Sequence, residues 1–359
     1  DGLTDAVADA AAGGAISTYN LFRFSRLGYR RLFGVITPEE EAERLAMREG
    51  VLRAVESLAG LDAETLRQLA DAFVDHFGAR HADLRLLDLE HRLGLVSEGI
   101  LLRAYRDVAY LDGATALGAT AFATAATRLG LDLTRLRPRG ALVALRSATV
   151  RLETLLALRR KNVRDFVVRR FAELEAQGHG PQRHEGAVTR QMLIDRVLQG
   201  IDPMTGTTAD GNRAGSLHVA PRTATRITSE TAYVAAESYI RRTVEYRDAR
   251  EIAMAFVEVD RLRFEVDLPI RDVLGPNFAS SVEGVRRLGS LRNPQGIQSI
   301  DFTDGFVRAV FELAPYGEPR LVSLCPIGAY SCVVTTFAHK PFCKTPACSC
   351  KQTAMIRVV

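Results

Sequence analysis

Cysteine is missing from most of this chain of 359 residues. All five cysteines lie between Cys325 and Cys350, so the fold that precedes them cannot depend on disulfides. Lysine is similarly scarce, because the body of the chain uses arginine and three of its four lysines lie within residues 340–351. This change in composition marks residues 330–359 as a separate tail, whose order the sequence leaves open.

Long apolar runs are also missing. The stretch 113–130 is rich in alanine, glycine and threonine, but it is too short to cross a bilayer, which needs about 20 apolar residues. Close helix packing is therefore its expected use. The chain opens at Asp1 without the basic and apolar parts of a secretion signal, and we expect it to be the C-terminal piece of a longer protein.

A broad excess of positive charge is missing as well. The net charge is +1 for residues 1–180, −1 for 181–329 and +4 for 330–359. Proteins that bind nucleic acid irrespective of sequence normally show a wide basic surface. Stable DNA binding is therefore not expected, and any site for a polyanion must be local.

Residues 1–178 show helical patterns only. Thr37 and Asp62 are helix-capping residues, and apolar side chains recur every three or four positions after Asp62. The helices expected there cover 37–59, a segment from Asp62, 81–93, 97–111, 114–129 and 139–177. Gly-His-Gly-Pro at 178–181 breaks the last of them, and we place a domain boundary after residue 178.

Residues 179–329 change to a mixed pattern. An apolar helix face at 188–198 and a helix from Thr228 or Ser229 to Arg247 flank a polar loop at about 202–221. Strands are expected at 252–259, 261–268, 297–302, 306–313 and 320–325. Thr303-Asp304-Gly305 predicts a hairpin between the third and fourth of these. The expected fold is an all-α N-terminal region followed by an α+β domain of two helices and an antiparallel sheet.

Arg183 and His184 are the first candidates for chemistry. Histidine titrates near neutral pH, so His184 can serve as base or acid in the cleavage of a phosphodiester. Arg183 keeps its charge and would hold an anion or depress the pKa of the imidazole. A histidine that only packs at a helix entry explains the pair equally well.

The segment from Arg222 to Ser229 is the second candidate. Its arginines alternate with hydroxyl residues such as Thr225 just before a helix, an arrangement that can cradle a phosphate through guanidinium groups and backbone amides. Simple helix capping with solvated arginines is the alternative.

Three runs together resemble the C-terminal toxin domains of bacterial polymorphic toxins, over about residues 180–326. They are Arg-His followed by a Leu-Ile-Asp-Arg helix, then Gly-Ile-Asp-Pro-Met-Thr-Gly-Thr-Thr, then Ala-Thr-Arg. Such domains often begin with Arg-His-Gly-Pro, carry an Ala-Thr-(Arg/Lys)-Phe-x-Ser block and end in a Val-Thr-x-Tyr-Pro strand. They are similar to the ribonuclease toxins of the barnase, EndoU, colicin and RelE group and to ribonuclease A-like contact-dependent inhibition toxins.

The resemblance assigns roles residue by residue. Its start motif falls on Arg183 and His184, its hydroxyl block on Thr225 and Ser229, and its last-strand threonine on Ser323. Two positions depart from the pattern, because Glu185-Gly186 replaces Gly-Pro and Cys325 stands where a tyrosine is common. A role for that tyrosine therefore does not carry over.

The resemblance implies a secreted toxin, delivered into a target cell in interbacterial competition and acting in its cytoplasm. It implies RNA as substrate, a cognate immunity protein as partner, and metal-independent transphosphorylation without a cofactor. The predicted site residues are His184, Arg183, Arg222, Thr225, Ser229 and Ser323.

Two other functions stay open at this point. An NAD-dependent ADP-ribosyltransferase toxin would need a catalytic glutamate, for which Glu258 and Glu312 are the candidates. A non-enzymatic protein would use the helices of 97–130 on membranes and the rest as an adaptor. Zinc binding by the Cys-rich tail, from His339 to Cys350, is not predicted, because the spacing lacks paired Cys-x2-Cys knuckles. A serine hydrolase is not expected either, since no Gly-x-Ser-x-Gly motif is present.

Overall fold

A computed structural model describes residues 48–49, 62–117, 127, 138–255, 263–275, 278–314, 317–328 and 356–358. The chain divides into two compact units, Asp1–Val163 and Arg164–Val359. The dividing point lies inside a helix, α7 (Pro138–Gln177), which ends just before the predicted breaker at Gly178. The last part of α7 therefore belongs to the second unit, and each unit is described by itself.

The first unit is built from helices α4 (Ala63–Arg92), α5 (Glu98–Leu117) and the first part of α7. The Asp62 carboxylate caps α4 by accepting the backbone N–H groups of Glu64 and Thr65, as the sequence predicts. The helix predicted at 81–93 is the second half of α4. The helices predicted at 37–59 and 114–129 lie largely outside the described residues, apart from 48–49, 114–117 and 127, which are helical.

Apolar packing and buried polar contacts hold the first unit together. Four apolar side chains join α4 to α5: Leu84, Leu87, Leu101 and Val108. From α7, Arg159 forms ion pairs with Asp83 and Glu90 on α4, and Thr149 lies 3.0 Å from Nδ1 of the buried His76. No helix among the described residues is long and apolar enough to span a membrane.

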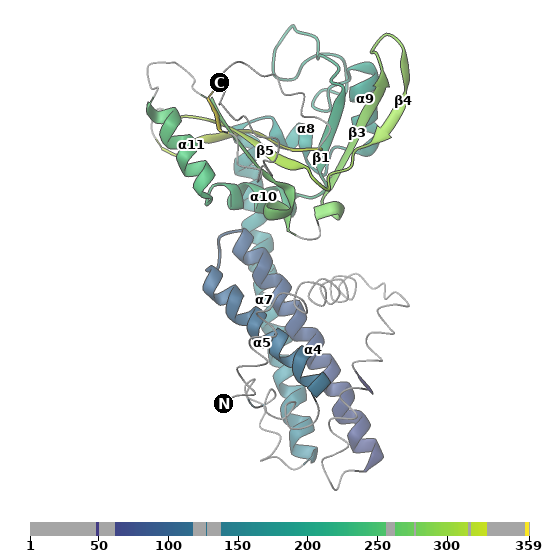
Figure 1. The fold of residues 1–359 in the computed structure, drawn as a ribbon, viewed down its shortest axis with the longest axis vertical. Helices are drawn as coiled ribbons and strands as arrows, with labels where there is room; N and C mark the ends of the chain where they lie inside the picture. The colour runs from purple at the N-terminus through teal and green to yellow at the C-terminus, as the bar shows by residue number, and fades with distance from the viewer. Residues whose placement is uncertain are drawn as a thin grey trace, which may run out of the picture. The chain divides into compact units, whose positions relative to one another are not determined.

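The second unit combines helices with two antiparallel sheets, which confirms the predicted α+β class (Figure 1). Its elements after α7 are α8 (Gly180–His184), α9 (Arg190–Gln199), β1 (Thr223–Ile227), α10 (Glu230–Ile240), α11 (Val244–Ala255), β2 (Arg263–Pro269), α12 (Ile270–Leu274), η1 (Phe278–Ser280), β3 (Val282–Gly289), β4 (Pro294–Ser299), β5 (Phe306–Glu312), β6 (Arg320–Ile327) and β7 (Ile356–Val358).

The strand orders are β1-β3-β4 and β6-β5-β2-β7. Strands β1 and β6 lie next to each other, so the two sheets meet there. The last strand, β7, comes from the tail 330–359 and pairs with β2 through Ile356–Val358.

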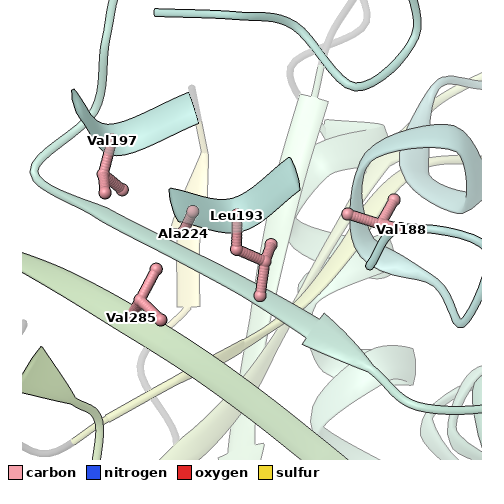
Figure 2. Packing of buried hydrophobic residues seen from close by; sticks show 5 residues of the cluster. All are labelled: Val188, Leu193, Val197, Ala224 and Val285. Atoms are coloured by element: carbon pink, nitrogen blue, oxygen red, sulfur yellow. The ribbon is translucent and has the colours of Figure 1, made fainter. Parts of the chain in front are cut away.

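Helix α9 covers the smaller sheet because its apolar residues fall on one side. Leu193 and Val197 pack on Ala224 of β1 and Val285 of β3, with Val188 at the edge of the cluster (Figure 2). Thr189 caps the start of α9, and Gly200, in the left-handed conformation at φ 72°, ends it. Arg196 lies on the same side of α9 as Leu193 and Val197, so this packing buries it as well.

Several predictions for the second unit are wrong. The helix expected from 228 to 247 is two helices, α10 and α11. Residues 252–255, expected in a strand, belong to α11, because Tyr246, Ala249 and Ala253 recur with helical spacing and bury one face. The remainder of that expected strand, 256–259, lies outside the described residues. The next expected strand, 261–268, is confirmed as β2 at 263–269, with 261–262 outside the described residues.

The predicted hairpin is also wrong. Residues 294–299 pair with β3, and β5 pairs with β2 and β6. The turn at 303–305 does form, but Phe302 before it is buried, and the chain passes there from one sheet to the other. No local pattern in the sequence predicted β1 or β3.

Candidate functional site

Two histidines flank the short helix α8. His179 is its N-cap residue and His184 is its last residue. The helix packs on β6 and β1, and Gly180 lies directly against the backbone of Ser323 and Leu324 in β6. Helix α8, and with it both histidines, is therefore held beside β1 and β6, where the two sheets meet.

His184 is oriented by the backbone of β1. Its Nδ1 lies 2.9 Å from the carbonyl oxygen of Thr225. A carbonyl only accepts, so the hydrogen of a neutral ring is on Nδ1 and the lone pair is on Nε2. Burial lowers the pKa of His184 to about 3, and the positive charge of Arg196 adds to this effect. The ring is thus neutral near pH 7, and Nε2 is the atom that can take a proton.

His179 has a similar environment. Burial, together with the charges of Arg183 and Arg196, lowers its pKa to about 4. A positive charge on His179 in turn lowers the pKa of His184, so the two imidazoles influence each other. An anion bound beside the two imidazoles would raise both pKa values.

Arg183 faces the loop that follows α9. Its Nε donates to Asp202 at 3.0 Å and its Nη2 donates to Asp210 at 2.8 Å. Asp202 is fully buried and also accepts the backbone N–H groups of Met204 and Gly211. Burial raises the pKa of Asp202, but these hydrogen bonds outweigh it and lower the pKa to about 2. Arg183 thereby fastens the loop 202–218 to α8.

Arg196 is the exceptional charged group of this region. The residue is buried, with 9 % of its surface exposed, and its Nε is buried without a hydrogen-bond partner in the described part of the chain. Among the described residues, no carboxylate lies within ion-pair distance of it. Burial, followed by the charge of Arg183, lowers its pKa.

Two further titratable groups border this cluster. His218 lies in the loop with its Nδ1 3.1 Å from the carbonyl oxygen of Gly200, and burial and Arg196 lower its pKa. Cys325 on β6 is a free thiol, and burial raises its pKa to about 11. The thiol is therefore protonated near neutral pH.

The structure brings together part of the predicted set. His184, Arg183, Thr225 and Ser323 all belong to α8 or to the strands beneath it. Thr225 contributes its carbonyl to His184. Ser229 uses its hydroxyl to cap α10, accepting the N–H of Ala232, and Arg222 is exposed at the start of β1, where its carbonyl accepts the N–H of Arg287.

His179 and Arg196 were not among the residues predicted from the sequence. A signal for His179 was available, because His179-Gly180-Pro181 matches the His-Gly-Pro of the toxin start motif better than His184-Glu185-Gly186 does. Arg196 had no local signal, because an arginine on an amphipathic helix is ordinarily solvated. Only the packing of α9 shows that it is buried.

The candidates for the alternative chemistries have other roles or lie elsewhere. Glu312 is held by Arg263 and Arg320 at 3.0 and 2.7 Å, and Glu258 lies outside the described residues. The described residues contain no group of three His, Cys, Asp or Glu side chains that could hold a metal ion. The tail residues considered for zinc, from His339 to Cys350, also lie outside the described part of the chain.

The arrangement can bind an anion and move protons beside it. Two neutral imidazoles, one of fixed tautomer, accompany the guanidinium of Arg196, whose buried Nε has no hydrogen-bond partner among the described residues. Comparison of the chain with protein-family models, with curated proteins and with solved structures finds no match.

Proposed function

We propose that the second unit cleaves RNA by metal-independent transphosphorylation. The observation that carries the proposal is the pair His179 and His184, held at the two ends of one short helix beside Arg196, whose buried Nε has no hydrogen-bond partner among the described residues. Cleavage next to a 2′-hydroxyl needs one group that removes a proton, another that supplies one, and a cation for the phosphate. These three side chains supply that combination.

His184 suits the role of the base. Its Nδ1 hydrogen is directed at the Thr225 carbonyl, so the lone pair on Nε2 can take the proton from the 2′-hydroxyl. The 2′-oxygen then forms a bond to phosphorus while the bond from phosphorus to the 5′-oxygen breaks. The products are a 2′,3′-cyclic phosphate and a free 5′-hydroxyl.

His179 suits the role of the acid. In the free protein its pKa is about 4, so it is mostly neutral near pH 7. The negative charge of a bound phosphodiester raises that pKa and favours the protonated ring, which then donates its proton to the departing 5′-oxygen. Binding of the substrate therefore charges the acid.

The other predicted residues take supporting roles in this proposal. Arg183 positions α8 and the loop 202–218, because its donors are directed at Asp202 and Asp210. Ser323, partly buried on β6 beside Gly180, is a hydroxyl donor toward the phosphate. Exposed Arg222 suits a neighbouring phosphate of the RNA, and Ser229 supports β1 by capping the helix after it.

The biological setting is proposed from the sequence resemblance. A ribonuclease of this kind acts as a toxin delivered into the cytoplasm of a target cell, and its producer needs an immunity protein that blocks the site. The near-neutral charge of residues 181–329 counts against a broad basic surface for RNA, so a phosphate site there must be local.

Purified full-length chain and a short RNA with one cleavable ribonucleotide test the activity. We expect cleavage in the presence of EDTA, a product ending in a 2′,3′-cyclic phosphate, and no cleavage when the 2′-hydroxyl is replaced by hydrogen. His184→Ala and His179→Ala should each lower kcat/KM by about 10²- to 10⁴-fold.

His91→Ala is the control, because it removes a histidine of the first unit and should leave the rate unchanged. Cleavage of the 2′-deoxy substrate, or dependence on added metal, would contradict the proposal. Release of nicotinamide from NAD with intact RNA would favour the ADP-ribosyltransferase alternative.

A further inference from the structure

We propose that Arg196 is the anchor of a phosphate-binding site formed by α8, the last turn of α9 and the start of the loop 202–218. The inference deepens the proposed function by assigning the residue that binds the phosphate group of the substrate. Its basis is the burial of Arg196, the lack of a hydrogen-bond partner for its Nε among the described residues, and the charged groups near it.

A buried guanidinium is costly unless a negative group or several acceptors satisfy it. Two other buried or half-buried arginines of the second unit have such acceptors. Arg226 pairs with Glu283 at 2.6 Å, and Arg287 donates to the carbonyl oxygen of Val197. Arg196 has neither kind of contact with any described residue, although it lies on the same helix as Val197. Its position makes sense if a ligand supplies the missing acceptors.

The neighbouring carboxylates do not neutralise the charge of Arg196. Asp202 and Asp210 raise the pKa of Arg196 from a distance, but burial and the charge of Arg183 outweigh them. Both carboxylates are already engaged by Arg183. The titratable and charged groups that act on Arg196 or respond to it are His179, Arg183, His184, Asp202, Asp210, His218 and Cys325.

A phosphate group matches these surroundings better than a carboxylate does. The planar guanidinium presents several N–H donors to two oxygens at once, and the remaining oxygens can accept from the imidazoles. Each imidazole gains a proton more readily once the anion is present. Binding of phosphate should therefore be accompanied by uptake of protons and should strengthen as the pH falls toward about 6.

Calorimetric titration of the full-length chain with inorganic phosphate, and in parallel with uridine 3′-monophosphate, measures the site directly. We expect binding of phosphate by the wild type, with proton uptake visible as a dependence of the heat on the buffer. Arg196→Met should weaken binding by about 10- to 100-fold, because it removes charge-assisted hydrogen bonds. Arg247→Met, an exposed arginine on α11, is the matched control and should bind as the wild type does.

Stability separates a binding residue from a structural one. Without ligand, Arg196→Met should unfold at the same temperature as the wild type or a higher one, because an unpaired buried charge has been replaced by an apolar side chain of similar length. Arg196→Lys keeps the charge without the planar fork and should bind with intermediate affinity. If Arg196→Met does not fold, the affinity of Arg196→Lys for phosphate is compared with that of the wild type instead.

The outcomes distinguish this inference from the proposed function. Undiminished phosphate binding by both Arg196 variants, or no binding of either probe to the wild type, would overturn the inference. Binding of the nucleotide alone, lost in the Arg196 variants, supports it and shows that the nucleoside contributes. Phosphate binding without RNA cleavage would support the Arg196 site and contradict the proposed ribonuclease activity.

Discussion

At Gly180, the first residue of α8, the chain has no room for a side chain. A Cβ there would overlap the hydroxyl of Tyr233, which is fully buried, and would lie 3.3 Å from the backbone of Leu324. Gly180→Ala should therefore lower the free energy of unfolding by about 1–3 kcal/mol through overpacking. It should also lower RNA cleavage, because α8 must move away from β6 and takes both histidines with it.

Thermal unfolding of the variant measures this effect, with Gly99→Ala as the control. A Cβ at Gly99, near the start of α5, meets no atom within 4 Å, so that variant should be unchanged or slightly stabilised. An unfolding midpoint of Gly180→Ala equal to that of the wild type would show that α8 is not pressed against Tyr233.

Residues of the candidate site could be predicted only where neighbouring residues in the sequence form a recognisable pattern. His184 and Arg183 stood out because a histidine beside an arginine follows a helix breaker. The partner of His184 is a backbone carbonyl of Thr225, 41 positions away, and no side-chain pattern encodes it. From the sequence alone, Arg183 was expected to bind an anion. In the structure it binds Asp202, which lies 19 positions away, and only the folded path of the chain brings the two side chains together.

At the scale of elements, the loop 202–218 depends on one carboxylate. Asp202 collects hydrogen bonds from Arg183 and from the backbone of Met204 and Gly211. Asp202→Asn keeps the size of the side chain but leaves Arg183 with a buried charge that is only partly compensated. The free energy of unfolding should fall by about 3 kcal/mol, the usual effect of removing one partner of a buried ion pair.

The same change should loosen the loop. Limited proteolysis is expected to cut Asp202→Asn within residues 202–218 faster than the wild type, whereas Asp248→Asn, an exposed control on α11, should be cut at the wild-type rate. Equal rates for all three proteins would mean that other contacts, such as those of Thr205 and Thr207, hold the loop.

Elements were predictable when their periodicity was complete and local. Strand β2 alternates along its whole length, and α4 has both a cap and an apolar face. Strand β1 has only five residues and follows the loop directly, so its threonines and arginines resembled a helix entry. Strand pairing was not predictable, because β1 pairs with β3 across more than fifty intervening residues.

At the scale of the whole molecule, buried histidines make both units sensitive to acid. Burial lowers the pKa of His76 in the first unit to about 4, and His179 and His184 in the second unit are lowered similarly. In the unfolded chain these rings titrate near about 6.5. Between these values the unfolded state binds more protons than the native state, so the free energy of unfolding falls as the pH is lowered from about 6.5 to about 4.

Chemical denaturation between about pH 7.5 and 4.5 should show this fall, and two substitutions assign it to the units. His184→Gln removes one titrating ring from the second unit, and the slope of its unfolding free energy should become shallower by about 1.4 kcal/mol per pH unit. His76→Gln should do the same for the first unit alone. If the units unfold in separate transitions, each substitution changes only one of them. A fall that begins only below about pH 4 would mean that these histidines bind protons equally in the native and the unfolded state, and that burial does not lower their pKa values.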